Sequence, residues 1–460
     1  MLKTKWCAVG LAALLSGTVS VQAQSTSRTR GQDASFGVRV LTPATDSTTP
    51  PGKFALSGST LVAQDSSAPA AKPLQSSEVA AQEPAPADEE KLGPTLPEDV
   101  KFLQSALFGD RHRDCPSALR LYGWLDAGYT YASTGPGPLT VETRENRFGN
   151  EFLFNEAALV LEKPLDPTRF SLGFNATFYA GADAALLRPE GGINTTNPRF
   201  GADFRQLFVS AHLPVLTDGG VDIKAGRMGT IIGYESALAP YRPFYSNDYQ
   251  WFYAEDGAFT GGLAIVHMNK QLDVIGGITL GANTFFTQRG DGPCIIGQVN
   301  YWLDECKTTL VSASTYCGHE AIFAAPGFAS RGEEDYTFEL RLQHKFSKEM
   351  EMIIQSDDGF ATELANGGSG QWYSLYDILI YHLNPKLDAN GRAEWFLDNK
   401  GTRTGFATNY YEVTLGFDYH PVNCLRIRPE VRGDFADDPV FRNGRDKSQL
   451  TLAIEGLLSF

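Results

Sequence analysis

Strict alternation of apolar and polar residues is the feature of this sequence that most restricts its fold. The clearest row has Tyr411, Val413, Leu415, Phe417 and Tyr419 at one set of positions and Glu412, Thr414, Gly416, Asp418 and His420 at the other. Successive side chains of a β-strand point to opposite faces, so this row predicts a strand with one apolar and one polar face. Tyrosines at both ends of the apolar row are typical of membrane-spanning strands, whose aromatic residues gather where hydrocarbon meets water.

The same alternation recurs through most of the chain after position 115. It predicts strands near 119–132, 151–163, 169–180, 204–213, 220–228, 259–269, 271–284, 335–346, 349–358, 371–383, 390–398, 409–420, 423–434 and 448–460. These are about fourteen strands, an even number, joined by connections that are short at one end and mostly long at the other, as in an up-and-down antiparallel β-barrel. The longest connection, 285–334, includes a stretch at 308–316 that also fits a hairpin, so twelve or sixteen strands remain alternatives.

The amino terminus has the pattern of a secretory signal peptide. Two lysines precede a short apolar run, and Val21 and Ala23 are small residues placed for cleavage before Gln24. The segment that follows is rich in Ser, Thr, Ala, Pro and Gln, a composition that buries too little apolar surface to offset its ordering entropy. The predicted organisation is a signal peptide (1–23), a disordered spacer (24–115) and an all-β, transmembrane barrel (116–460) in the bacterial outer membrane.

The carboxyl terminus carries a second, more local signal. Leu450, Leu452, Ile454 and Leu458 share one register of the last predicted strand with the terminal Phe460. An aromatic residue that ends an amphipathic strand resembles the signal that barrel-insertion machinery reads in bacterial outer-membrane proteins. We therefore expect Phe460 to act as an insertion signal.

Charged residues lie on the polar faces of several predicted strands. The candidates for lining the lumen and setting ion selectivity are Arg426, Arg428, Glu430, Arg432, Asp434, Arg392, Glu394, Arg227 and Glu235. In a barrel these side chains face the interior, where charges of both signs bias which ions pass. The alternative is that they pair with one another and stabilise the wall. The net charge of −15 argues against nucleic acid as a partner, since affinity for phosphate backbones comes from Lys and Arg.

The long connection 229–258 is a candidate constriction loop because it is rich in aromatic residues. Its candidate contact residues are Tyr241, Phe244, Tyr245, Tyr249 and Trp251, followed by Phe252 and Tyr253. These rings are able to stack on a flat solute if the loop folds inward. The alternative, which is more common, is that they pack the loop or join the interfacial girdle.

Five cysteines follow the predicted signal peptide: Cys115, Cys294, Cys306, Cys317 and Cys424. Three of them fall within the connection 285–334 and have spacings that fit one local disulfide, although the sequence does not identify the pair. The spacings are too wide for a CxxC metal site, and we expect neither a metal nor a cofactor. No nucleophile elbow, P-loop, dinucleotide-binding or HExxH motif is present, which argues against an enzyme.

The sequence resembles the OmpL-like outer-membrane β-barrel porin family over residues 119–460. The resemblance rests on Lys224-Ala225-Gly226-Arg227 through Gly233-Tyr234-Glu235 with Phe244-Tyr245-Ser246 and Thr260-Gly261, on Ala393-Glu394-Trp395-Phe396 with Asp398, and on Arg428-Pro429-Glu430-Val431-Arg432-Gly433-Asp434 leading to Phe460. It implies a channel but names no solute and assigns no catalytic residues.

These observations favour a porin that forms a water-filled channel for passive diffusion of small polar or charged solutes. The expected partners are outer-membrane lipid, such solutes or ions, and the barrel-insertion machinery, and a homo-oligomer is an open alternative to a monomer. Two other functions stay open: a plugged barrel that acts as a surface binding or adhesion protein, and an outer-membrane hydrolase whose site is assembled across strands.

Overall fold

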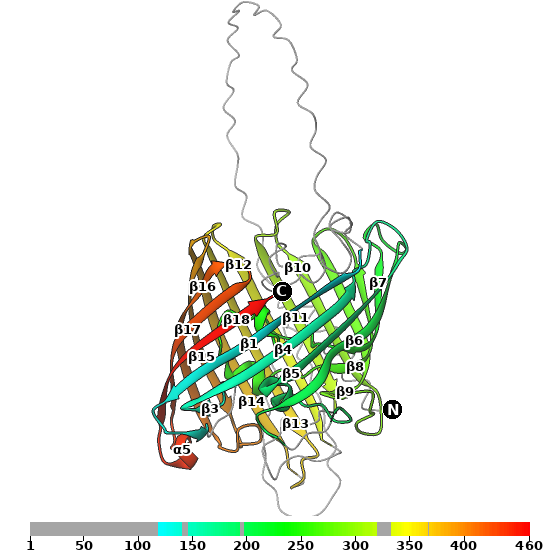
Figure 1. Ribbon diagram of the computed structural model, residues 1–460. Helices are drawn as coiled ribbons and strands as arrows, with labels where there is room; N and C mark the ends of the chain where they lie inside the picture. Colours follow the sequence, from blue (N-terminus) through cyan, green and yellow to red (C-terminus); the bar gives the residue numbers. More distant parts are fainter. Residues whose placement is uncertain (1–117, 140–145, 194–196, 320–332, 367) are drawn as a thin grey trace, which may run out of the picture. The chain divides into compact units, whose positions relative to one another are not determined.

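The computed structural model describes residues 118–139, 146–193, 197–319, 333–366 and 368–460. The predicted signal peptide (1–23) and spacer (24–115) lie outside these residues. Within them, sixteen antiparallel strands pair in sequence order into a closed barrel, in which the first strand also pairs with the last (Figure 1). No helix of the described residues is long and apolar enough to cross a membrane.

The barrel strands are tilted and joined to their neighbours along the chain, which is the up-and-down topology that the sequence predicts. Their bounds are β1 Arg120–Ala132, β4 Glu151–Lys163, β5 Ser171–Gly181, β6 Gly201–Leu213, β7 Val221–Met228, β8 Phe259–His267, β9 Leu272–Ala282, β10 Cys294–Trp302, β11 Thr309–Gly318, β12 Glu334–Lys345, β13 Met350–Thr362, β14 Gly370–Asn384, β15 Leu387–Asp398, β16 Thr408–Val422, β17 Leu425–Ala436 and β18 Ser448–Ser459. A separate two-stranded ladder joins β2 (Gly137–Pro138) and β3 (Phe148–Gly149).

The preferred count of fourteen strands is wrong, and sixteen is the alternative that holds. The extra pair is β10 and β11, which lies inside the segment 285–334 that the sequence suggested was one long connection. These strands alternate poorly: Ile295 and Ile296 are consecutive, and Leu310 and Tyr316 are buried apolar side chains on an inner face. The inner face here is mixed, because buried polar Gln298, Asn300, Ser312 and Ser314 lie between these apolar side chains, so the alternation is weak.

The predicted alternation matches the two faces of the barrel wall. In β16 the apolar row is exposed, with Leu415 60% exposed, whereas Glu412 and Thr414 of the polar row are buried. Outward-facing Phe152, Val209 and Ile278 are likewise more than 60% exposed. Large apolar side chains outside and buried charges inside are the reverse of a water-soluble protein, and they suit a barrel whose outer surface faces lipid.

The two ends of the barrel differ in the length of their connections. At one end, which we call the short-turn end, neighbouring strands are joined by brief turns, such as Pro385–Lys386 between β14 and β15 and Asn423–Cys424 between β16 and β17. The opposite, long-loop end carries longer connections, including 229–258 between β7 and β8. Short elements lie in this second set: α3 (Ala182–Leu186), η2 (Ala239–Tyr241), α4 (Tyr249–Tyr253) and α5 (Phe441–Gly444).

The carboxyl terminus closes the barrel at the short-turn end. Phe460 exchanges two backbone hydrogen bonds with Gly123 of β1, each 2.9 Å long. A Cβ atom at Gly123 would lie 2.3 Å from the carbonyl oxygen of Ala158 and 2.9 Å from the ring of Phe460. Gly123 therefore allows the close approach of the last residue to the first strand.

Candidate functional site: a loop held inside the barrel

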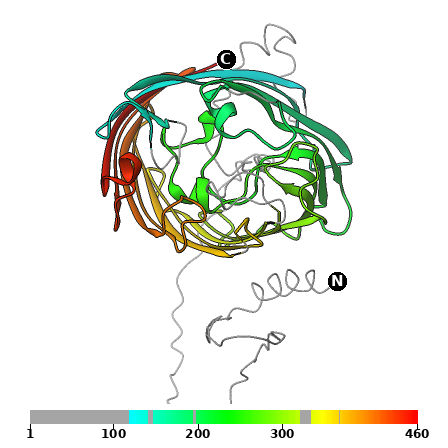
Figure 2. The ribbon, with the colours of Figure 1, turned by 90° about the horizontal axis from the view of Figure 1, so that it is seen from below.

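The connection 229–258, which we call the inner loop, folds into the barrel. In the view along the barrel it is the green segment that crosses the interior of the ring (Figure 2). Its two short elements, η2 and α4, lie within this segment, and most of its residues from Gly233 to Ala258 are buried. Backbone N–H and C=O groups that leave bulk water need new partners, and here charged side chains of the barrel wall provide many of them.

Arg428 of β17 binds the first part of the inner loop. Its guanidinium donates hydrogen bonds to the backbone carbonyl oxygens of Ala239, at 2.9 Å, and Arg242. The same group pairs with Glu455 of the neighbouring strand β18. Arg428 is only 1% exposed, so its charge is both neutralised and used to position the loop.

Two further members of the β17 row bind the middle of the inner loop. The carboxylate of Glu430 accepts hydrogen bonds from the backbone N–H groups of Tyr245 and Ser246, at 3.0 and 3.1 Å. Arg432 donates to the backbone carbonyl oxygen of Asn247 at 2.5 Å. The residue spacing of the wall row thus matches successive polar groups of the loop.

Strand β15 contributes the next two contacts. Arg392 forms ion pairs with Glu412 of the wall and with Glu235 of the inner loop, and it donates to the carbonyl oxygen of Ser246. Glu394 accepts hydrogen bonds from the backbone N–H groups of Tyr249 and Gln250, where α4 begins. A carboxylate at a helix amino terminus satisfies N–H groups that have no partner within the helix.

The remaining candidates for lining the lumen lie around these contacts. Arg426 pairs with Asp418 of β16 and donates to the carbonyl oxygen of Pro240. Asp434 pairs with Arg432 and accepts a hydrogen bond from the hydroxyl of Tyr249. Arg227 is the exception, because it binds Asp203 and backbone carbonyl oxygens of other segments rather than the inner loop.

Aromatic residues of the inner loop pack against the wall. Phe244, Tyr245 and Tyr249 are buried, and Trp251 is 8% exposed. Tyr249 stacks on Tyr253 and on Phe396 of β15, and the Tyr245 hydroxyl donates to Asn155. The guanidinium of Arg392 lies 4.9 Å from the centre of the Phe244 ring.

Tyr241, half-buried, meets Trp124 edge to face. These contacts match the alternative that the rings pack the loop.

The inner loop brings several acidic side chains into the interior. Burial raises the pKa of Glu235, Asp248, Glu255 and Asp256 above the ordinary carboxyl range. For Glu255, the nearby carboxylates Asp357 and Asp248 raise the pKa further. A small pocket beside this part of the loop is lined by Glu255, Asp256 and Trp251 together with Arg205 of β6, so charges of both signs face it.

Sequence reasoning missed Arg242, which joins the inner loop to three wall or helix carboxylates. It lies 3.3 Å from Asp126, 3.5 Å from Asp183 and 3.4 Å from Glu455. The sequence could have identified Glu455 as lumen-facing, because it falls in the polar register of the last predicted strand. It could not have identified Arg242, because the position of Arg242 depends on how the loop folds.

The cysteines at 294, 306 and 317 form no disulfide with one another, so the expectation of a local disulfide is wrong for this group. Cys306 lies in the turn between β10 and β11 at the short-turn end. Cys294 and Cys317 are near neighbours at the other end of those strands, but Cys317 pairs with Ile295, so its side chain points to the opposite face from Cys294. Cys294 and Cys306 are free thiols, as is the exposed Cys424. Cys115 lies outside the described residues.

A family model described as "Putative beta-barrel porin-2, OmpL-like" matches residues 118–460, which include all three stretches of the resemblance. No curated protein matches the sequence. Several solved structures are similar at 12% identity over 75% of this chain. They are the outer membrane channel DcaP of Acinetobacter baumannii (97% of that chain, TM-score 0.50), an anion-selective porin from Comamonas acidovorans (99%, 0.52) and OmpF of Salmonella typhi in complex with daunomycin (98%, 0.51).

These likenesses establish a porin fold, and the family match covers the whole barrel. The expected resemblance is confirmed, and the barrel has the fold of the outer-membrane porins. The chain belongs to the family of OmpL-like β-barrel porins.

Proposed function

We propose that the inner loop is the constriction of a water-filled channel through which small polar or charged solutes diffuse passively. The observation that carries this proposal is a set of charge-assisted hydrogen bonds with the backbone of the loop, donated by Arg392, Arg428 and Arg432 and accepted by Glu394 and Glu430. Such bonds are stronger than neutral ones and fix geometry as well as position. A loop held in this way sets the width of the lumen at a defined depth.

The predicted selectivity residues then act on permeation mainly by positioning the loop. Because most of their charges are paired, the field that a solute meets depends on which charges the loop leaves facing water. The pocket lined by Arg205, Glu255 and Asp256 supports a path with both basic and acidic side chains along it. Flat apolar solutes are disfavoured, since the aromatic rings of the loop are occupied by packing contacts.

The same proposal includes the route and setting of the protein. It has three parts: the signal peptide is cleaved before Gln24, barrel-insertion machinery recognises Phe460, and the apolar outer face contacts outer-membrane lipid. The exposed apolar rows of β16 and β18 support the last of these. A homo-oligomer stays a prediction.

Planar-bilayer recording with purified protein tests this function. We expect stepwise, ohmic currents, and a reversal potential in a salt gradient that shifts when Arg428→Gln and Arg432→Gln are introduced. Currents without such a shift would remove these two residues from selectivity. Conductance near zero would favour the plugged, surface-binding alternative, and substrate turnover that fails when one nucleophile is replaced would favour a hydrolase.

A further inference from the structure

Four of the histidines face the lumen at the short-turn end, and each lies beside an aspartate of its own or a neighbouring strand. His212 with Asp222 and His267 with Asp273 lie on one arc of the barrel, on β6–β9. His382 with Asp388 and His420 with Asp418 lie on the opposite arc, on β14–β16. The barrel order places four strands between the arcs on one side and five on the other.

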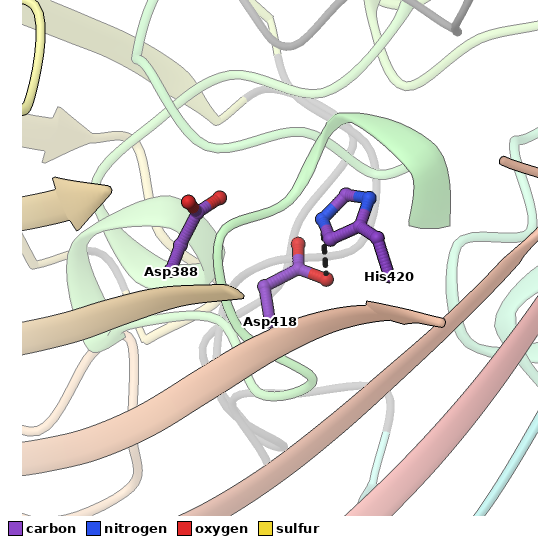
Figure 3. Close-up of side chains that lie close together, drawn as sticks. All are labelled: Asp388, Asp418 and His420. Carbon is purple, nitrogen blue, oxygen red and sulfur yellow. Dashed lines mark ion pairs between the residues drawn. The ribbon is translucent and has the colours of Figure 1, made fainter. Parts of the chain in front are cut away.

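The second arc brings three donor atoms together. Asp388, Asp418 and His420 each offer one possible metal-binding atom, and these three atoms lie within 4.8 Å of one another. Figure 3 shows these side chains close together on the neighbouring strands β15 and β16. The register explains the cluster, because Asp388 and Asp418 are direct partners across the β15–β16 pair and His420 follows two residues later on the same face.

His420 points into the cluster. Its buried Nε2 atom lies 3.1 Å from Asp418 Oδ1, an ion-pair contact, and has no other partner among the described residues. Adjacent ligands of a metal ion with bonds near 2.1 Å are about 3.0 to 3.4 Å apart. The spacing of these two atoms is therefore that of two ligands on one ion.

His382 of this arc and Arg426 of the adjacent strand β17 complete the arrangement. His382 Nδ1 lies 2.7 Å from Asp388 Oδ1, an outer contact of the kind that orients a metal-binding carboxylate. Arg426 donates to both carboxylate oxygens of Asp418, at 3.2 Å to Oδ1, and so lowers the negative charge of the cluster from two to one. This pairing disfavours a tightly held ion and leaves an exchangeable one.

We propose that Asp388, Asp418 and His420 bind a divalent transition-metal ion at the short-turn mouth of the lumen. One imidazole nitrogen and two carboxylate oxygens form a ligand set suited to ions such as Zn²⁺, Co²⁺ or Ni²⁺, with water in the remaining positions. Calcium and magnesium prefer oxygen ligands alone. Binding requires Asp388 to close a gap of up to 4.8 Å by about 1.4 to 1.8 Å, a rotamer-scale movement available to a half-buried side chain. The proposal does not depend on what the channel conducts.

The first arc supplies a matched control. It has the same residue types at the same end of the barrel, yet among the described residues only the second arc brings three such atoms within range. His212 and His267 both contact Asp222, but from its opposite oxygens. Equivalent substitutions in the two arcs therefore separate a specific site from general attraction of cations to histidines at a channel mouth.

The test uses full-length protein without a polyhistidine tag, in detergent. Zn²⁺ binding is measured by competition with a chromophoric chelator, and Co²⁺ binding by visible absorption, for wild type, Asp388→Asn, His420→Gln and the control His267→Gln. We expect one ion per chain, at least tenfold weaker binding in the first two variants, loss of the Co²⁺ absorption in His420→Gln and wild-type behaviour in His267→Gln. Excess Ca²⁺ should not compete.

Heat-dependent gel migration verifies that each variant is a folded barrel. If His420→Gln misfolds, His420→Asp replaces it, because an aspartate keeps a metal-binding oxygen at this position and should recover part of the Zn²⁺ affinity. Equal binding by wild type and folded His420→Gln would overturn the proposal. Equal losses in His267→Gln and His420→Gln, or displacement of Zn²⁺ by equimolar Ca²⁺, would also overturn it. These results are independent of conductance, so failure here leaves the channel function untouched.

Discussion

Glu394 of β15 accepts a 2.7 Å hydrogen bond from the backbone N–H of Tyr249, a residue 145 positions earlier in the chain. Its other oxygen accepts from Gln250 at 2.6 Å. One buried wall carboxylate thereby fixes the start of α4, the element of the inner loop whose rings pack on the same strand.

Removing this carboxylate should loosen the inner loop without opening the barrel. Glu394→Ala leaves two buried N–H groups without their acceptor, at a cost of about 1–3 kcal/mol to docking of the loop. We expect faster cleavage within 229–258 by proteases in detergent, with unchanged heat-modifiable migration. Glu162→Gln is the control, because Glu162 is also buried on the inner wall but binds Asn175 of the adjacent strand. Equal cleavage of the two variants would contradict the anchoring role.

A charge-conserving change at Arg392 separates a field effect from a positioning effect. Arg392 contacts Glu235, Glu412 and Ser246 at once, which a planar guanidinium allows and a lysine ammonium does not. We expect Arg392→Lys to raise conductance and to change the reversal potential toward that of Arg392→Gln. If Arg392→Lys instead behaves as wild type in both measurements, the charge alone is what matters.

Acidification should hold the inner loop more firmly. Burial, followed by Asp357 and Asp248, raises the pKa of Glu255, so the docked loop binds a proton at higher pH than an undocked loop does. Stability from this group is fully present below the ordinary carboxyl pKa of about 4.3 and is lost as pH rises through the raised value. Conductance should therefore fall as pH is lowered from neutral. Glu255→Gln should weaken that dependence, and an unchanged pH profile would refute this assignment.

Much of the barrel could be predicted from the sequence because lipid and water act on opposite faces of each strand. The alternating apolar and polar residues of β16 and β17 are easily recognised in the sequence for this reason. The hairpin β10–β11 was only an alternative in the sequence, because part of its inner face is apolar: Cys294 and Ile296 pack with Ile232 of the inner loop.

The candidate site was predicted in part. The charges of β15 and β17 were placed on the inner face by periodicity alone. Their partners could not be, since the pairing of Arg392 with Glu235 or of Arg428 with the Ala239 carbonyl depends on the path of a loop that no strand pattern describes.

Gly233 is a point at which the inner loop disfavours a side chain. Its φ of +88° is a left-handed conformation, and a Cβ atom would lie 2.0 Å from the Glu255 carboxylate. Its N–H also donates to Glu339 of β12. Gly233→Ala should destabilise loop docking by about 1–3 kcal/mol, seen as increased protease cleavage within 229–258. Gly229→Ala is the control because nothing lies within 4 Å of its Cβ position, and similar cleavage of both would contradict the prediction.

The most direct measurement is the single-channel conductance of wild type beside the double variant Glu394→Gln, Glu430→Gln. These changes keep the size of both side chains and remove the charges that hold Tyr245, Ser246, Tyr249 and Gln250. If the inner loop is the constriction of an open channel, both proteins give ohmic steps and the variant conducts more. Identical conductance in the two proteins, or no steps in either, would contradict the account.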